Sequence, residues 1–131
     1  MAEAKIGFVG EAGSNPEVKP YWDACNEGKL MLTRCKDTGK VFSYPRGVSP
    51  FTLSNNVEWF EAKGTGVIYS FSTMERASPP YTIAYVTLDE GTTIMSGITD
   101  TDLSALKIGQ KVKVVFKASE TGQKVPFFTA A

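Results

Sequence analysis

Histidine is absent from this sequence of 131 residues. Histidine is the commonest general base and the commonest metal ligand of proteins. Its absence excludes the Ser–His and Cys–His pairs that activate most nucleophilic side chains. The sequence also carries no P-loop, no Gly-rich dinucleotide fingerprint and no metalloprotease motif. We therefore do not expect a catalytic centre of a common kind.

Net charge is also absent, because 14 basic residues balance 14 acidic residues. General nucleic-acid binders show a basic excess, since contacts to phosphate supply much of their affinity. No segment approaches the roughly 18 apolar residues of a membrane span. Residues 1–13 show no basic region followed by a long apolar run, as a secretory signal would. We therefore expect a cytoplasmic protein that does not bind membranes, and the composition disfavours a general nucleic-acid binder.

Cysteine occurs only twice, as Cys25 and Cys35. In an intracellular protein we expect both to be reduced thiols rather than a disulfide. A thiol acts as a nucleophile only beside a base or in a positive field. Arg34 and Lys36 flank Cys35, but no histidine is available, so we interpret Cys35 as structural.

The first half of the chain predicts one short helix and one β-hairpin. Pro20 suits the first turn of a helix, and Gly28 suits its end. After Lys29 the residues alternate as in a strand, and the Gly-containing turn 37–40 separates two such runs.

From Val57 onward the sequence is typical of an all-β domain. The expected strands are 57–62, 67–72, 81–88, 92–98, 110–118 and 125–128, with one helical turn near 102–106. Five or six short strands with a helical turn before the penultimate one fit an OB-fold barrel. A small sandwich is the alternative. The fold class is thus mainly β, with a five- or six-stranded C-terminal barrel.

A set of short motifs recurs in the order of a known family. They are Tyr21-Trp22, Gly28-Lys29-Leu30, Arg34-Cys35-Lys36, residues 39–42, Tyr44-Pro45-Arg46, residues 66–71, Pro80-Tyr81, residues 84–86, residues 88–91, Ile108-Gly109 and residues 126–128. Over about residues 19–128 the sequence resembles a domain-of-unknown-function family of OB-fold, acyl-CoA-associated proteins. This resemblance implies an N-terminal arm and helix (1–28), a rubredoxin-like zinc-ribbon module (29–56) and an OB-fold domain (57–131).

The zinc ligands of that family are degenerate here. Its members carry two Cys-x-x-Cys turns, and the matching positions are Cys35, Thr38, Ser49 and Thr52. Structural zinc requires four thiolate or imidazole ligands in nearly all cases. We therefore expect no zinc, and we expect the hydroxyl side chains to hold the turns through hydrogen bonds to nearby backbone.

Positive charge is concentrated on the expected ribbon. Residues 29–46 contain one acidic residue, Asp37, and five basic ones: Lys29, Arg34, Lys36, Lys40 and Arg46. Lysine and arginine suit the phosphates of coenzyme A. The alternatives are a solvated hairpin or contact with an acidic patch of a partner protein.

Aromatic and acidic side chains have structural interpretations that compete with functional ones. Tyr21 and Trp22 lie on a short helix that must bury its apolar face, against the barrel or against another protein. Stacking on bases is conceivable for the strand aromatics Trp59, Tyr69, Phe71, Tyr81, Tyr85, Phe127 and Phe128, but most strand aromatics are core residues. The acidic residues Asp89, Glu90, Asp100 and Asp102 lie at turn signals, where aspartate is favoured for backbone reasons.

The resemblance implies a non-catalytic accessory subunit of a thiolase-like, hydratase-like or aldolase-like enzyme, with acyl-CoA as a shared ligand. The partner would then supply the catalytic residues. The alternatives are an OB-fold protein that binds single-stranded nucleic acid, and a self-sufficient acyl transferase that uses Cys35.

Overall fold

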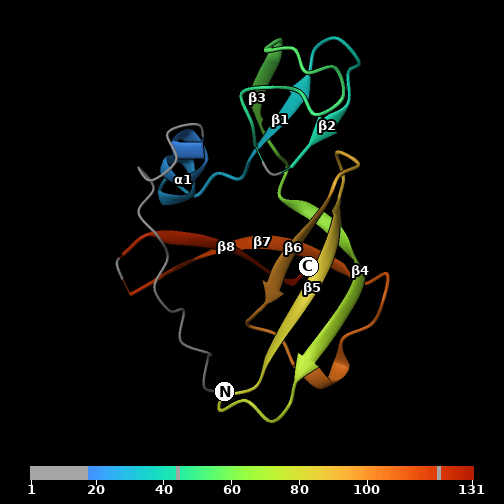
Figure 1. Ribbon diagram of the computed structural model, residues 1–131. Helices are drawn as coiled ribbons and strands as arrows, with labels where there is room; N and C mark the ends of the chain where they lie inside the picture. Colours follow the sequence, from blue (N-terminus) through green and yellow to red (C-terminus); the bar gives the residue numbers. More distant parts are fainter. Residues whose placement is uncertain (1–17, 44, 121) are drawn as a thin grey trace.

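The computed structural model describes residues 18–43, 45–120 and 122–131. Its elements are α1 (Lys19–Asn26), β1 (Met31–Cys35), β2 (Val41–Phe42), β3 (Val57–Glu61), β4 (Thr65–Met74), β5 (Tyr81–Leu88), β6 (Thr93–Ile98), the 3₁₀ turn η2 (Leu103–Ala105), β7 (Lys111–Ala118) and β8 (Lys124–Ala130). A small sheet lies above a barrel, and α1 lies beside both (Figure 1). The structure confirms the mainly β fold.

The barrel closes in the strand order β4-β5-β6-β8-β7. Side chains alternate along β5, where Thr82, Ala84, Val86 and Leu88 are buried and the residues between them point outward. Phe128 of β8 is completely buried at the centre of the apolar cluster. Five strands with η2 before the penultimate one confirm the OB-fold barrel.

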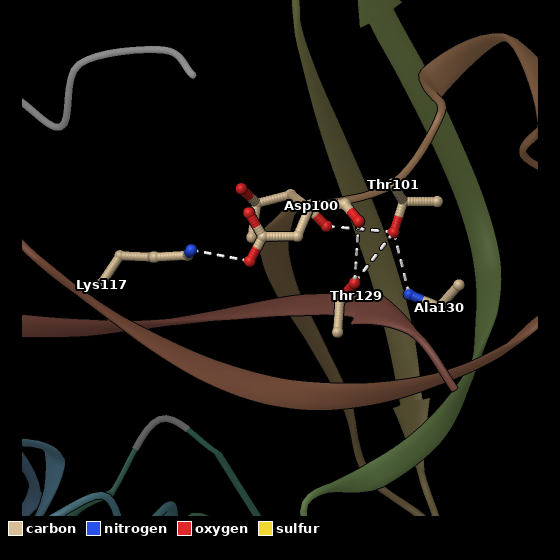
Figure 2. A network of polar contacts seen from close by, with 6 residues as sticks. Asp100, Thr101, Lys117, Thr129 and Ala130 are labelled. Carbon is tan, nitrogen blue, oxygen red and sulfur yellow. Dashed lines mark hydrogen bonds and ion pairs between the residues drawn. The ribbon is translucent and has the colours of Figure 1, made fainter. Parts of the chain in front are cut away.

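The seam between β6 and β8 is closed mainly by side chains. These two strands are parallel and share one register pair, Ile98 with Phe128. Beyond it, the Thr101 hydroxyl lies 2.9 Å from the Thr129 hydroxyl and accepts the N–H of Ala130 at 3.0 Å (Figure 2). This polar network continues the closure where the backbone ladder stops.

The ribbon is a three-stranded sheet in the order β2-β1-β3. β3 pairs with β1 along its whole length, from Met31 opposite Glu61 to Cys35 opposite Val57. The ribbon sheet therefore extends past the expected domain boundary at residue 57, because it includes β3, and the closed barrel begins with β4. A period-two pattern identifies a strand, but it does not specify the sheet that the strand joins.

Helix α1 connects the ribbon to the barrel. Tyr21 and Cys25 face inward and are buried. The Asn26 side chain accepts the Lys124 N–H at 2.9 Å, and the Gln123 side chain donates to the Trp22 carbonyl at 3.0 Å. These bonds fix the helix to the turn between β7 and β8. Among the residues that the structure describes, no helix is long and apolar enough to cross a membrane.

Candidate functional site

Two turns of the ribbon share the same backbone geometry. In the first knuckle, residues 35–39, the Gly39 N–H donates to the Cys35 carbonyl at 2.7 Å. In the second knuckle, residues 49–53, the Leu53 N–H donates to the Ser49 carbonyl at 3.0 Å. Gly39 has φ of 74° and Leu53 has φ of 61°, so each knuckle ends in a left-handed residue. The two knuckles therefore have the same backbone conformation and lie opposite one another.

The four degenerate positions meet between these knuckles. Cys35 and Ser49 are completely buried. The Cys35 Sγ lies 3.9 Å from the Thr52 Oγ1. Hydrogen bonds lower the pKa of Cys35 to about 7, chiefly those from the Ser49 and Thr38 side chains, with a further one from Thr52. The family resemblance therefore identified a cluster that the fold assembles.

Hydroxyl oxygens accept the backbone amides of both knuckles. The Ser49 Oγ accepts the N–H of Phe51 at 3.1 Å and that of Thr52 at 3.3 Å. Thr38 and Thr52 each accept the N–H two residues further along the chain, at 3.3 and 3.4 Å. These are the local bonds expected of short hydroxyl side chains in turns.

Asp37 joins the first knuckle to the second. Its carboxylate accepts hydrogen bonds from the Thr52 hydroxyl at 3.2 Å and from the Asn56 amide at 2.8 Å. Hydrogen bonds from Asn56, and then from Ser54 and Thr52, lower the pKa of Asp37. The sequence carries no signal for this role, because no spacing rule connects Asp37 with a side chain 19 residues away.

The cluster does not fit a zinc ion. Cys35 is the one thiol, and Thr38, Ser49 and Thr52 supply neutral hydroxyls where tetrahedral zinc takes thiolate or imidazole. Within the described residues there is no group of three or more His, Cys, Asp or Glu side chains that suits a metal. In place of metal ligation, hydrogen bonds to Cys35, Ser49 and Asp37 connect the residues between the two knuckles.

The five basic residues do not form one site. Lys29 precedes β1 and Lys36 follows it, so the length of the strand, about 13 Å at its rise per residue, lies between them. Arg34 pairs with Glu58 at 2.9 Å and lies over the Phe60 ring at 4.3 Å.

Lys36, Lys40 and Arg46 are exposed cations that follow the end of β1 in the chain. Lys40 lies over the Phe51 ring at 5.2 Å from its centroid. Within the described part of the chain the structure gives Lys36 and Arg46 no ion pair. These three are thus the candidates that remain for phosphate contact at the knuckle end of the ribbon.

The aromatic pair of α1 faces the protein itself. Tyr21 is 9% exposed and belongs to the central apolar cluster, and the half-buried Trp22 packs against it edge to face at 5.1 Å. Docking to a partner can therefore use Trp22 but not the Tyr21 ring. Burial raises the pKa of the neighbouring Cys25 thiol to about 12, which makes it unreactive.

The acidic residues at turn signals have structural partners. Asp89 accepts a hydrogen bond from the Thr65 hydroxyl, and Glu90 accepts the Lys63 N–H at 2.9 Å. Asp100 pairs with Lys117 at 2.6 Å, as Figure 2 shows. Asp102 caps η2 by accepting the Ser104 N–H at 3.0 Å.

Comparison with known proteins places the two modules in one family. Residues 22–48 match the family described as "ChsH2, rubredoxin-like zinc ribbon domain", and residues 59–117 match "ChsH2, C-terminal OB-fold domain". A "DUF35 domain-containing scaffold protein" of Methanothermobacter thermautotrophicus is 31% identical over 102 residues, which span 72% of this chain and 77% of the relative. The chain belongs to the DUF35 family.

Two further relatives differ in length. The "DUF35 domain-containing scaffold protein" of Pyrococcus furiosus is 27% identical over 79% of this chain and 80% of its own length. A "Probable enoyl-CoA hydratase alpha subunit" of Thermomonospora curvata is 24% identical over 85% of this chain, which covers 36% of that larger protein.

A solved structure shares the fold over nearly the whole chain. The structure called "Ltp2-ChsH2(DUF35) aldolase" aligns with a TM-score of 0.78 and 23% identity, over 90% of this chain and 97% of the matched chain. A DUF35 protein of unknown function from Sulfolobus solfataricus aligns with a TM-score of 0.65 and 14% identity. At these identities, the similarity establishes the fold alone.

Proposed function

We propose that this chain is a non-catalytic accessory subunit of a thiolase-like, hydratase-like or aldolase-like enzyme acting on acyl-CoA. The observation that carries the proposal is similarity over most of the chain to proteins called scaffold proteins, and to one called an enoyl-CoA hydratase subunit. The name of the similar solved structure, which joins a DUF35 protein to an aldolase, supports the same assignment.

The residue inventory supports an accessory role. The sequence has no histidine. The two thiols are buried, and the acidic residues at turn signals bond to nearby backbone or side chains. A partner would supply the nucleophile and the general base, and this subunit would help to bind or orient the acyl-CoA thioester.

The ribbon would contribute charge to that shared site. Lys36, Lys40 and Arg46 are exposed near the knuckles, where ammonium and guanidinium groups suit the pyrophosphate and 3′-phosphate of coenzyme A. Lys29 lies at the far end of β1, and Arg34 is bound to Glu58, so both are weaker candidates.

We also propose that the ribbon works without zinc. One thiol and three hydroxyls replace the ligand set implied by the family, and hydrogen bonds bridge the two knuckles. The subunit would then keep its shape under chelating conditions that unfold metal-dependent ribbons. We propose a cytoplasmic location for this subunit as well.

Affinity purification from the native cell extract tests the function. The tagged full-length chain is expected to retain a thiolase-fold, hydratase-fold or aldolase-fold protein at about equal stoichiometry, identified by mass spectrometry. Retention of no such enzyme, from an extract in which acyl-CoA enzymes are detected, would contradict the proposal.

A further inference from the structure

Three adjacent strands of the barrel contain no charged side chain. β4, β5 and β6 lie next to one another and contain ten, eight and six residues. None of these residues is acidic or basic. By contrast, β7 carries Lys111, Lys113 and Lys117. A solvent-facing strand surface of a monomer normally includes charged side chains, so this region requires another explanation.

Large apolar side chains point outward from these three strands. The outer face is formed by Val67, Tyr69, Met74, Tyr81, Ile83, Tyr85 and Met95, each between 37% and 67% exposed. We call this set the apolar face. Two register pairs join its members, because Tyr85 lies opposite Met95 on β6, and Tyr81 lies opposite Met74 on β4. Between them, Ser70 and Ser72 of β4 lie opposite Tyr85 and Ile83.

The apolar face has the composition and size of a protein interface. Interface centres are depleted in charge and enriched in tyrosine and methionine, and their rims are polar. Here Glu75 and Arg76 follow β4 at one end, and Asp89 and Glu90 follow β5 at the other. Three half-exposed tyrosines offer about 300 Å² of surface. With the aliphatic side chains, the face offers about 600 Å², most of the ~800 Å² that each partner buries in a standard interface.

The shape and chemistry of the apolar face restrict its occupant. OB folds often bind nucleic acid on their central strands, but single strands require basic side chains beside the aromatics. The outside of a closed barrel is convex, so two copies of it would touch over only a narrow strip. A protein surface that is apolar, uncharged and flat or concave complements it best.

We infer that the apolar face docks the catalytic subunit of the acyl-CoA enzyme. This inference rests on the proposed function and assigns its partner surface to the barrel rather than to α1. In the assembled enzyme, β4, β5 and β6 would be covered, and the ribbon would remain beside the joint site.

Point variants test the assignment with the purified catalytic subunit as the probe. Tyr85→Lys introduces a charge at the centre of the apolar face, and we expect it to weaken binding by about 30-fold or more. Tyr85→Phe keeps the ring, and Lys113→Gln changes an exposed position on β7, so both should bind like the wild type. Circular dichroism and thermal melting verify that all three variants fold.

Footprinting of tyrosine side chains tests the same surface without a chosen partner. The tagged full-length chain is labelled in native extract and again after purification, and the modified tyrosines are mapped by mass spectrometry. We expect Tyr69, Tyr81 and Tyr85 to be protected in the extract and labelled in the pure protein. Equal labelling in both samples would overturn the inference.

The outcomes separate this inference from the proposed function. An acyl-CoA enzyme that co-purifies while Tyr85→Lys binds normally would overturn the surface assignment alone. A dimer of the pure chain that Tyr85→Lys dissociates, or an oligonucleotide complex that it abolishes, would assign the face to a different occupant. An absence of any acyl-CoA enzyme, with unprotected tyrosines, would overturn both proposals.

Discussion

The ribbon and the barrel are stabilised by different interactions. The barrel buries apolar side chains around Phe128, and its adjacent strands pair over as many as eight positions. The ribbon has a β2 of two residues, and its knuckles are built around Cys35, Ser49 and Asp37. A module this small usually needs a metal or a disulfide. We propose that hydrogen bonds among thiol, hydroxyl and carboxylate groups perform that structural role here.

Placing cysteine at the three degenerate ligand positions should let a metal ion stabilise the ribbon. The variant Thr38→Cys/Ser49→Cys/Thr52→Cys supplies four thiols between two knuckles that already have matching geometry. We expect it to bind one zinc ion with an apparent free energy of about 10 kcal/mol, as zinc-finger peptides do. Metal analysis and thermal melting with and without a chelator measure this gain. The wild-type protein, which should show no change on chelation, is the control.

Truncation of the central barrel residue should have the largest destabilising effect. Phe128→Ala removes a completely buried ring and should lower the free energy of unfolding by about 3–5 kcal/mol. Denaturant unfolding measures the loss. Ile108→Ala, at a position 72% exposed, provides the control and should change stability by less than about 0.5 kcal/mol. A small effect at Phe128 would contradict the description of the barrel core.

Loss of one knuckle hydroxyl should destabilise the ribbon and leave the barrel intact. Ser49→Ala leaves the N–H groups of Phe51 and Thr52 without their acceptor, at a cost of about 1–3 kcal/mol. Amide hydrogen exchange should show faster exchange in the two knuckles and unchanged protection in β5. Ser72→Ala, at an exposed position of β4, is the matched control. Faster exchange throughout the chain would mean that the two modules unfold together.

Relief of backbone strain should stabilise the second knuckle. Leu53 has a positive φ and an 82% exposed side chain, whereas Gly39 occupies the equivalent place in the first knuckle. Leu53→Gly removes about 1–2 kcal/mol of strain but increases the entropy of the unfolded chain, so the net gain should be about 0.5–1 kcal/mol. A lower melting temperature would show that Leu53 makes compensating contacts.

The link between the knuckles should weaken in acid. The pKa of Asp37 is lowered in the folded protein, so its contribution to stability is present above the ordinary pKa of about 3.9 and is lost as the pH falls through the folded value. Protection factors of the knuckle amides, which correct for the intrinsic pH dependence of exchange, should therefore fall more below pH 4 in the wild type than in Asp37→Asn, in which the titrating group is absent.

Sequence patterns predicted the elements better than their partners. Alternation along residues 81–88 and 110–118 correctly indicated strands, and Pro20 and Gly28 bounded the helix. The pairing of β3 with β1 was missed, because a strand of five residues carries no signal for its sheet. The contact between Asp37 and Asn56 depends on that pairing, so it could not be predicted either.

The apolar face shows a second limit of sequence analysis. Tyr81, Ile83 and Tyr85 alternate with small or apolar residues, and the whole run resembles a strand buried on both faces. The expectation that most strand aromatics are core residues therefore failed for Tyr69, Tyr81 and Tyr85, which are between 41% and 67% exposed. The four positions between the knuckles, in contrast, were correctly grouped by family resemblance.

Reconstitution with the purified catalytic subunit tests whether this chain is an accessory subunit. Turnover of an acyl-CoA thioester is measured for this chain alone, for the partner alone and for the equimolar pair. We expect no turnover by this chain and a higher kcat/KM for the pair than for the partner alone. Turnover by this chain alone, or a partner whose kcat/KM is unaffected by it, would contradict the assignment as an accessory subunit.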